Sequence, residues 1–232
     1  MAKILLLTLV FPPDSVSTAH LLGDLAEDLT NLGHDVKVIT AIPHYNKDVE
    51  SEISQLLIPF IGKIIQISKF RFLDVYHIWV PDKSCGKAKK LFGWLIFHII
   101  TLFLGLLPRF KSDIVLSTSP PLSIGLCGAF LAKVYKGKSV YNIWELFPEV
   151  AVHMRIIKNS YIISLLRKLE SYVYRLNDHL CTLGKCMAQK VIESGVRRNK
   201  VSIIPTAADI NGFLPMERSN LFSKAYRLDE KF

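Results

Sequence analysis

Short apolar runs alternate with helical patterns along the chain, and this alternation limits the folds that the chain can adopt. Between the first two runs, leucines at positions 21, 22, 25 and 29 fall on one face of a helix that extends to Asn31, and Gly33 supplies its left-handed cap. Strands that alternate with helices form βαβ units, whose parallel strands are covered by helices on both faces. The sequence therefore predicts an α/β fold with a doubly wound, mainly parallel sheet of about seven strands. The runs cover residues 4–10, 34–40, 73–80, 112–118, 138–144, 178–183 and 200–205.

The first apolar run, in MAKILLLTLVFPP, is open to two interpretations. A lysine followed by a short apolar stretch is typical of a signal peptide, but FPPDS offers no small-residue cleavage site. A buried parallel strand followed at once by a turn is therefore favoured. The four cysteines show no C-x-x-C spacing, which argues against a zinc site or a disulfide framework and favours a reduced, cytoplasmic compartment.

The charge of the chain favours an anionic partner. Lys and Arg number 29 against 20 Asp and Glu, which gives a formal net charge of +9. Nucleic acid, acidic lipid and a phosphorylated ligand all remain open on charge alone. The seven histidines show no grouping of metal-ligand type, so no metal site is predicted.

Polar residues gather just after the predicted strands. Ligands of parallel sheets bind outside the carboxyl ends of the strands, so we expect the functional site at that edge. The candidate side chains are Asp14, Ser15 and Ser17 after the first run, His44 and Tyr45 after the second, Thr118 and Ser119 after the fourth, and Glu145 and Glu149 after the fifth. Two alternatives remain open: the His and Tyr could serve packing alone, and the two hydroxyls could bond the backbone of their own turn.

An ordered set of motifs resembles a known family. The set comprises FPPD, LAEDLTNLGHDVKVIT, IPHYN, DIVLSTSPPL, WELFPE, LLRKLESYVYRLND and VSIIPTAADINGFLP. Together these segments resemble the N-terminal half of a family 4 glycosyltransferase of the GT-B fold, in particular its WbuB-like branch, which builds cell-surface polysaccharides. The resemblance extends over essentially the whole chain and implies a Rossmann-like domain.

The resemblance also implies a division of labour. Enzymes of this family have two Rossmann-like domains, of which the N-terminal one holds the acceptor and the C-terminal one binds the nucleotide-sugar donor. We therefore expect residues 1–205 to be the acceptor-side domain and residues 206–232 to be a linker to a donor-binding domain that this chain lacks. On that expectation the chain alone has little transferase activity, and it needs no cofactor and no metal.

Two carboxylates stand where the family carries acids, in ELFPE. By resemblance, Glu145 is the first choice for a catalytic contact that helps to remove the proton of the acceptor hydroxyl during retaining transfer, and Glu149 is the second choice. An acid directly after a buried strand is costly unless it has a partner or faces a cleft, which favours a functional role for Glu145. The alternative for Glu149 is that it stabilises the start of the following helix.

A basic and apolar segment lies between the third and fourth runs. Residues 83–111 contain six Lys or Arg and no acid, and they flank an apolar run at 91–107. At ~1.5 Å per residue the run reaches only ~25 Å, and a membrane crossing would divide one sheet between two sides of a bilayer. Two interpretations of the apolar run remain, a helix buried against the sheet and a helix lying in the membrane interface. The second is favoured. The residues expected at an anionic membrane surface are Lys87, Lys89, Lys90, Trp94, Arg109 and Lys111.

These observations predict a cytoplasmic protein, peripheral on the inner face of the cell membrane, that acts on a lipid-linked glycan acceptor. Two rivals remain: a non-catalytic module that binds acceptor or lipid-linked glycan, and another GT-B enzyme such as a sugar-nucleotide epimerase. A dinucleotide-dependent oxidoreductase is disfavoured because FPPDSVS, and not G-x-G-x-x-G, follows the first strand. Nucleic-acid binding is disfavoured because the basic residues flank an apolar helix without interleaved aromatic residues.

Overall fold

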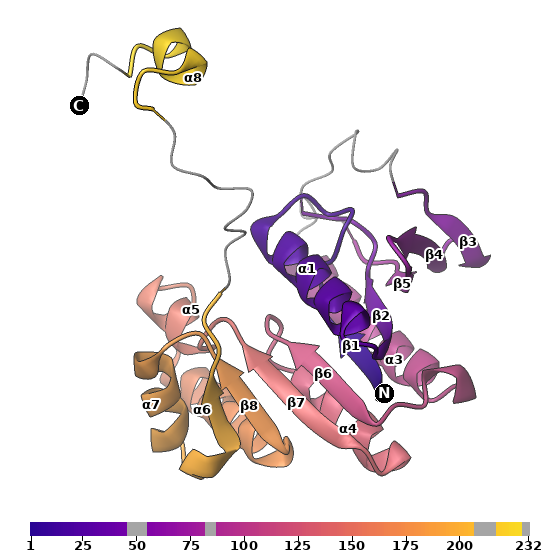
Figure 1. Cartoon of the computed structure of the whole chain (residues 1–232). Coiled ribbons are helices and arrows are strands. Elements are labelled where there is room, and N and C mark those ends of the chain that lie inside the picture. Colours follow the sequence, from indigo (N-terminus) through magenta and orange to yellow (C-terminus); the bar gives the residue numbers. More distant parts are fainter. Residues whose placement is uncertain (46–54, 82–86, 207–216, 229–232) are drawn as a thin grey trace.

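The computed structural model describes residues 1–45, 55–81, 87–206 and 217–228, with the side chains of the helix that starts at Lys87 described from Phe92 onward. A single twisted sheet runs through the molecule, with strands in the order β3-β4-β5-β2-β1-β6-β7-β8-β9 (Figure 1). The parallel strands are β1 (Lys3–Leu7), β2 (Asp35–Ala41), β5 (Leu73–Ile78), β6 (Ile114–Thr118), β7 (Lys138–Ile143), β8 (His179–Thr182) and β9 (Val201–Ile203).

All seven predicted strands are confirmed, and the sheet has two more. Strands β3 (Ile58–Ile61) and β4 (Ile65–Phe70) extend it antiparallel beyond β5. The turn from β4 to β5 uses Arg71 at φ 53°, without the Gly or Asn that usually marks such a turn. All four residues of β3 are exposed, so the alternation of apolar and polar residues that reveals a half-buried strand is absent there.

The helices cover both faces of the sheet unequally. The helix α1 lies on one face, and α3, α4, α6 and α7 lie on the other (Figure 1). Gly33 follows α1 with φ +86°, which confirms the predicted left-handed cap. The helical elements are α1 (Ser17–Asn31), α3 (Lys87–Gly105), η1 (Pro108–Phe110), α4 (Ile124–Tyr135), α5 (Glu149–His153), α6 (Ser160–Leu176), α7 (Lys185–Glu193), η2 (Arg198–Lys200) and α8 (Leu221–Ala225).

Strand β1 lies near the middle of the sheet and is buried on both faces. Ile4 and Leu6 pack toward α1, whereas Leu5 and Leu7 belong to the larger core that α3, α4 and α6 complete. Side chains alternate between the two faces along a strand, so a strand covered on both sides has to be apolar throughout. This arrangement explains why MAKILLLTLV has the composition of a signal peptide while forming a core strand.

The helix α3 is buried on one side and exposed on the other. Phe97, Thr101 and Leu104 are fully buried against the sheet. On the opposite side of the helix a stripe of large apolar side chains is exposed, with exposed fractions of 57% for Leu95 and 65% for Phe103. None of the described helices is long and apolar enough to be a candidate for crossing a membrane. We name the exposed side chains the α3 stripe: Phe92, Leu95, Ile99, Phe103 and Leu106.

Candidate active site

The loops that follow the parallel strands meet at one edge of the sheet, which we call the carboxyl edge. The order of strands changes direction between β1 and β6: the chain proceeds from β1 to β2 and β5 on one side, and from β6 to β7, β8 and β9 on the other. Loops on the two sides of such a switch point diverge and leave a crevice in which ligands of α/β proteins bind. The candidate residues follow β1, β2, β6 and β7, whose carboxyl ends lie together at this edge.

Asp14 joins the loops after β1 and β2. Its carboxylate is buried and accepts hydrogen bonds from the backbone N–H groups of His44 (3.2 Å) and Tyr45 (3.1 Å). The imidazole Nδ1 of His44 lies 3.8 Å from the same oxygen. Ser15 is half-buried beside them, and Ser17 is the exposed first residue of α1. A buried carboxylate that accepts two N–H groups fixes the course of both loops.

A buried polar network supports these loops from β4 and β5. The Gln55 amide donates to the Pro12 carbonyl (2.9 Å) and to the Ser68 hydroxyl (2.8 Å). The Ser68 hydroxyl lies 2.7 Å from His77 Nε2, and His77 Nδ1 lies 3.3 Å from the Ala41 carbonyl. Burial lowers the pKa of His77 to about 4, so the imidazole is neutral at neutral pH and can donate to Ala41 while accepting from Ser68. The network ties the ends of the first two loops to the unpredicted part of the sheet.

Ser119 joins the loops after β6 and β7. Its hydroxyl accepts the backbone N–H of Trp144 (2.9 Å), and its own N–H donates to the Asn142 carbonyl (3.0 Å). Thr118 is buried, and its hydroxyl has no hydrogen-bond partner among the described residues. Ser119 therefore bonds the backbone of the loop after β7, 25 residues away, and not that of its own turn as the structural alternative predicted. The acceptor role of this pair stays a prediction.

Glu145 extends from the loop after β7 into the crevice and is exposed. Burial, and then the charges of Glu145 and Asp14, raise the pKa of Tyr45, so both carboxylates lie within electrostatic range of this phenol. The carboxyl edge therefore brings Glu145, Tyr45 and Asp14 together from three loops. An exposed carboxylate in this position can accept a hydrogen bond from a sugar hydroxyl and take its proton.

Glu149 has a partner on another helix. It is the first residue of α5, and Arg167 of α6 donates to its Oε1 from Nη2 (2.9 Å) and Nε (3.2 Å). His153, four residues later, lies 3.8 Å from the other carboxylate oxygen. Arg167 was missed from the sequence, because no local pattern connects residues 18 positions apart. The acceptor role of Glu149 stays a prediction.

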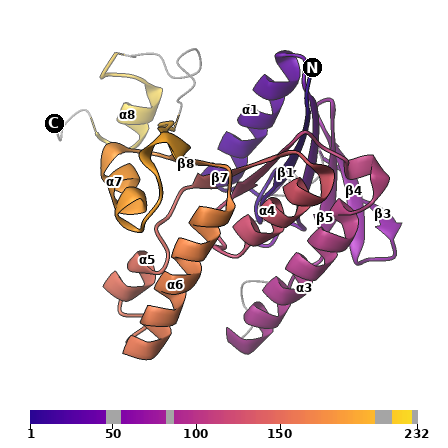
Figure 2. The ribbon, with the colours of Figure 1, turned by 90° about the horizontal axis from the view of Figure 1, so that it is seen from below.

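The helices α3 and α6 extend beyond α4 at the carboxyl edge, as Figure 2 shows. The Ser123 hydroxyl lies 3.0 Å from His98 Nε2, and a Cβ on Gly125 would lie 2.6 Å from Val173. The start of α4 is therefore level with the middle of α3 and with the last turns of α6. About ten residues of each longer helix project past it, or about 15 Å.

A pocket of about 290 Å³ lies at the base of these projecting helices and is mainly apolar. Trp94 of α3 lines one wall, Leu166 and Leu169 of α6 line the other, and Glu145 lies at the rim. Trp94 was predicted to lie at a membrane surface. The two leucines were not predicted as site residues, because they fall on the apolar side of an amphipathic helix like ordinary core residues. We call this feature the α3–α6 groove.

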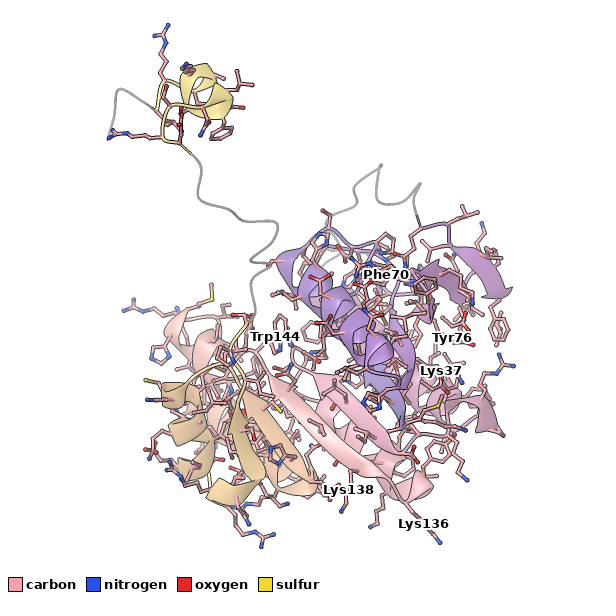
Figure 3. All side chains as sticks on the ribbon, in the orientation of Figure 1. Lys37, Phe70, Tyr76, Lys136, Lys138 and Trp144 are labelled. Atoms are coloured by element: carbon pink, nitrogen blue, oxygen red, sulfur yellow. The ribbon has the colours of Figure 1, made fainter. Side chains whose placement is uncertain are left out.

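A second pocket, of about 480 Å³, lies on the other face of the sheet. Trp144 lies there between α1 and the strands β7 and β8 (Figure 3), and its indole nitrogen is buried without a hydrogen-bond partner in the described part of the chain. Asp24 and Arg71, which lie 3.7 Å apart, also line this pocket. Asn142 reaches it from β7, so charged and amide side chains line this second pocket.

The predicted membrane residues divide between the two ends of α3. Lys87, Lys89 and Lys90 occupy its first turn, but their side chains lie outside the described part of the structure. Arg109 lies past the other end, in η1, where its guanidinium lies 5.2 Å from the centre of the Phe60 ring. Lys111 follows directly. Over the described ranges, no group of three or more His, Cys, Asp or Glu side chains could hold a metal ion.

Comparisons with known proteins identify the family and the fold. Residues 18–207 match the family described as the glycosyl transferase 4-like domain. WcaI of Escherichia coli strain K12, which is named as a colanic acid biosynthesis glycosyl transferase, is 23% identical over 239 residues, which cover 98% of this chain and 55% of WcaI.

Two solved structures resemble the fold. HepE of Anabaena in complex with UDP-glucose has a TM-score of 0.60 at 12% identity, over 98% of this chain and 50% of HepE. The catalytic domain of starch synthase IV from Arabidopsis thaliana, bound to ADP and acarbose, has a TM-score of 0.58 at 13% identity, over 94% of this chain and 54% of that domain. The chain thus spans about half the length of the relatives it matches and corresponds to half of a GT-B enzyme. It belongs to the glycosyl transferase 4-like family.

Proposed function

We propose that this chain is the acceptor-side domain of a retaining glycosyltransferase that moves a sugar from a nucleotide-sugar to a lipid-linked glycan acceptor in cell-surface polysaccharide synthesis. The observation that carries the proposal is the position of Glu145, exposed in the crevice at the switch point and close enough to Tyr45 for its charge to raise the phenol pKa. The family match supports the reaction class. The name of WcaI supports a polysaccharide pathway.

Glu145 accepts a hydrogen bond from the acceptor hydroxyl and helps to remove its proton as the new bond forms. Asp14 holds the loop that carries His44 and Tyr45, and these side chains orient the acceptor sugar. Ser119 fixes the backbone immediately before Glu145 through the N–H of Trp144. The nucleotide-sugar binds to a second domain that faces the same crevice, for which the relatives' additional length leaves room.

A transfer assay tests the proposal. This chain, extended by the second half of WcaI, is incubated with radiolabelled nucleotide-sugars and a bacterial lipid extract, and label in the lipid fraction is measured. We expect Glu145→Gln to lower kcat by about 100-fold or more, the range for loss of a general acid or base. The matched variant Glu149→Gln should lower it less than tenfold. Equal activity of Glu145→Gln and the parent would contradict the catalytic role.

The binding module is the second candidate, because the chain spans only about half the length of the relatives it matches. It predicts that the unextended chain binds a lipid-linked glycan while the extended chain transfers no label. An epimerase would instead interconvert the nucleotide-sugar without any acceptor. Product analysis of the same incubations by chromatography distinguishes the three outcomes.

Peripheral attachment to the inner face of the cytoplasmic membrane is part of the proposal, and the α3 stripe supports it. Five large apolar side chains stand unpartnered on one side of a single helix, whose first turn carries three lysines in the sequence. Such a face inserts among lipid head groups and is attracted by anionic lipid. In flotation with acidic liposomes at low salt, Phe92→Asp should reduce the bound fraction severalfold. Phe72→Asp, which alters an even more exposed phenylalanine just after β4, should leave the bound fraction unchanged.

A further inference from the structure

We infer that the α3–α6 groove binds the hydrocarbon chain of the acceptor, in the segment nearest its anionic head, and so selects an acceptor with a single long chain. The inference deepens the proposed function and rests on it. It differs from attachment to a membrane, because the α3 stripe faces outward from α3, whereas the groove lies between two helices. The groove would withdraw one chain from the bilayer while the stripe touches the bilayer surface.

The shape of the groove argues for a narrow apolar occupant. Its walls are Trp94 on one helix and Leu166 and Leu169 on the other, and its floor is the rigid turn that contains Pro120 and Pro121. The pocket is small, about 290 Å³, and two projecting helices confine it laterally. A single chain fits between two helices, whereas a folded protein surface or a two-chained lipid would have to spread over them.

The walls do not move freely against the floor. His98 of α3 is tied to Ser123 at the start of α4 (3.0 Å), and burial lowers the pKa of this imidazole, so it stays neutral. On the other side, α6 lies so close to α4 that Gly125 has no room for a Cβ beside Val173. The groove is therefore preformed, and a ligand does not have to open it.

The position of the groove gives the occupant an orientation. Glu145 lies at its rim, so a chain in the groove leads directly from the proposed sugar-transfer position. The formal net charge of +9 favours an anionic link between the hydrocarbon and the sugar. Hydrocarbon in the groove, a sugar at Glu145 and an anionic link between them match an amphiphile that carries a phosphate or pyrophosphate.

Titration calorimetry on the 232-residue chain tests this inference with soluble probes. The probes are inorganic pyrophosphate, dimethylallyl diphosphate with five carbons and geranyl diphosphate with ten. We expect the affinity to rise at least tenfold from the five-carbon to the ten-carbon probe, because the added carbons leave water. Pyrophosphate alone should bind no better than the five-carbon probe.

Matched variants locate the binding site. Leu166→Asp places a charge in the groove and should abolish the gain in affinity from the five-carbon to the ten-carbon probe. Leu165→Asp makes the same change at the neighbouring exposed position and should retain this gain in affinity. Trp94→Ala, on the opposite wall, removes the same gain without adding a charge and serves if Leu166→Asp proves misfolded by circular dichroism. The inference is overturned if chain length has no effect, if Leu165→Asp loses the gain as fully as Leu166→Asp, or if both groove variants retain it.

The calorimetry and the transfer assay can fail independently. Sugar transfer to lipid, with an affinity that does not depend on the length of the hydrocarbon chain, would support the proposed function and contradict hydrocarbon binding in the groove. Binding that strengthens with the length of the hydrocarbon chain, without any sugar transfer, would support the groove as a hydrocarbon-binding site and contradict the proposed catalytic function.

Discussion

Acidification should weaken the fold through His77. This imidazole is buried with a pKa of about 4, against 6.5 for an unperturbed histidine. Between those values the unfolded chain takes up a proton that the folded chain does not, so the free energy of unfolding falls as the pH falls. From the two pKa values, the free energy of unfolding falls by about 2 kcal/mol between pH 7 and pH 5, and by about 3 kcal/mol in total once the pH is below 4. The loss starts near pH 6.5 and is complete near pH 4.

Urea unfolding at pH 7, 6 and 5, followed by circular dichroism, measures this effect. Because other groups also titrate, the quantity of interest is the difference between the parent and His77→Gln. The variant has no titrating group at this position and can still bond Ser68 and the Ala41 carbonyl. We expect the parent to be the more stable at pH 7 and its advantage to shrink by about 2 kcal/mol at pH 5. A difference that stays constant within about 0.5 kcal/mol would refute the buried, neutral imidazole.

Three substitutions test other parts of the structure. Gly125→Ala should destabilise the chain by about 1–3 kcal/mol in urea unfolding, because the added Cβ would collide with Val173. The control Gly184→Ala should change stability little, because no atom lies within 4 Å of the position of its Cβ. Equal stabilities of the two variants would contradict the close contact of α4 and α6. Asn159→Ala should cost about 1 kcal/mol in the same assay, since the side-chain oxygen caps α6 by accepting the N–H groups of Tyr161 and Ile162 in its first turn; an unchanged midpoint would argue against the cap. Asp14→Ala should release the loop after β2 and raise KM severalfold with a smaller effect on kcat in the transfer assay; a selective fall in kcat would instead assign this carboxylate to the chemistry.

Local patterns predicted most of the sheet. Leu5 and Leu7 on one side and Ile4 and Leu6 on the other require a strand buried on both faces, and β2 and β5 likewise contribute buried residues to both cores. The strands β3 and β4 could not be predicted this way. Their position at the sheet edge, the exposure of β3 and a turn built on Arg71 remove the alternation and the turn residues on which such predictions depend.

The candidate site was predictable as an edge of the sheet but not as an arrangement of side chains. The sequence alone determined which residues follow the strands, because the carboxyl ends of parallel strands must lie together. Only the tertiary structure decided that Asp14 accepts the N–H groups of a loop 30 residues away, that Glu149 pairs with Arg167, and that α3 and α6 project past α4 to form a groove. These contacts join segments far apart in the chain, and their geometry depends on relative helix lengths and packing, which no local periodicity records.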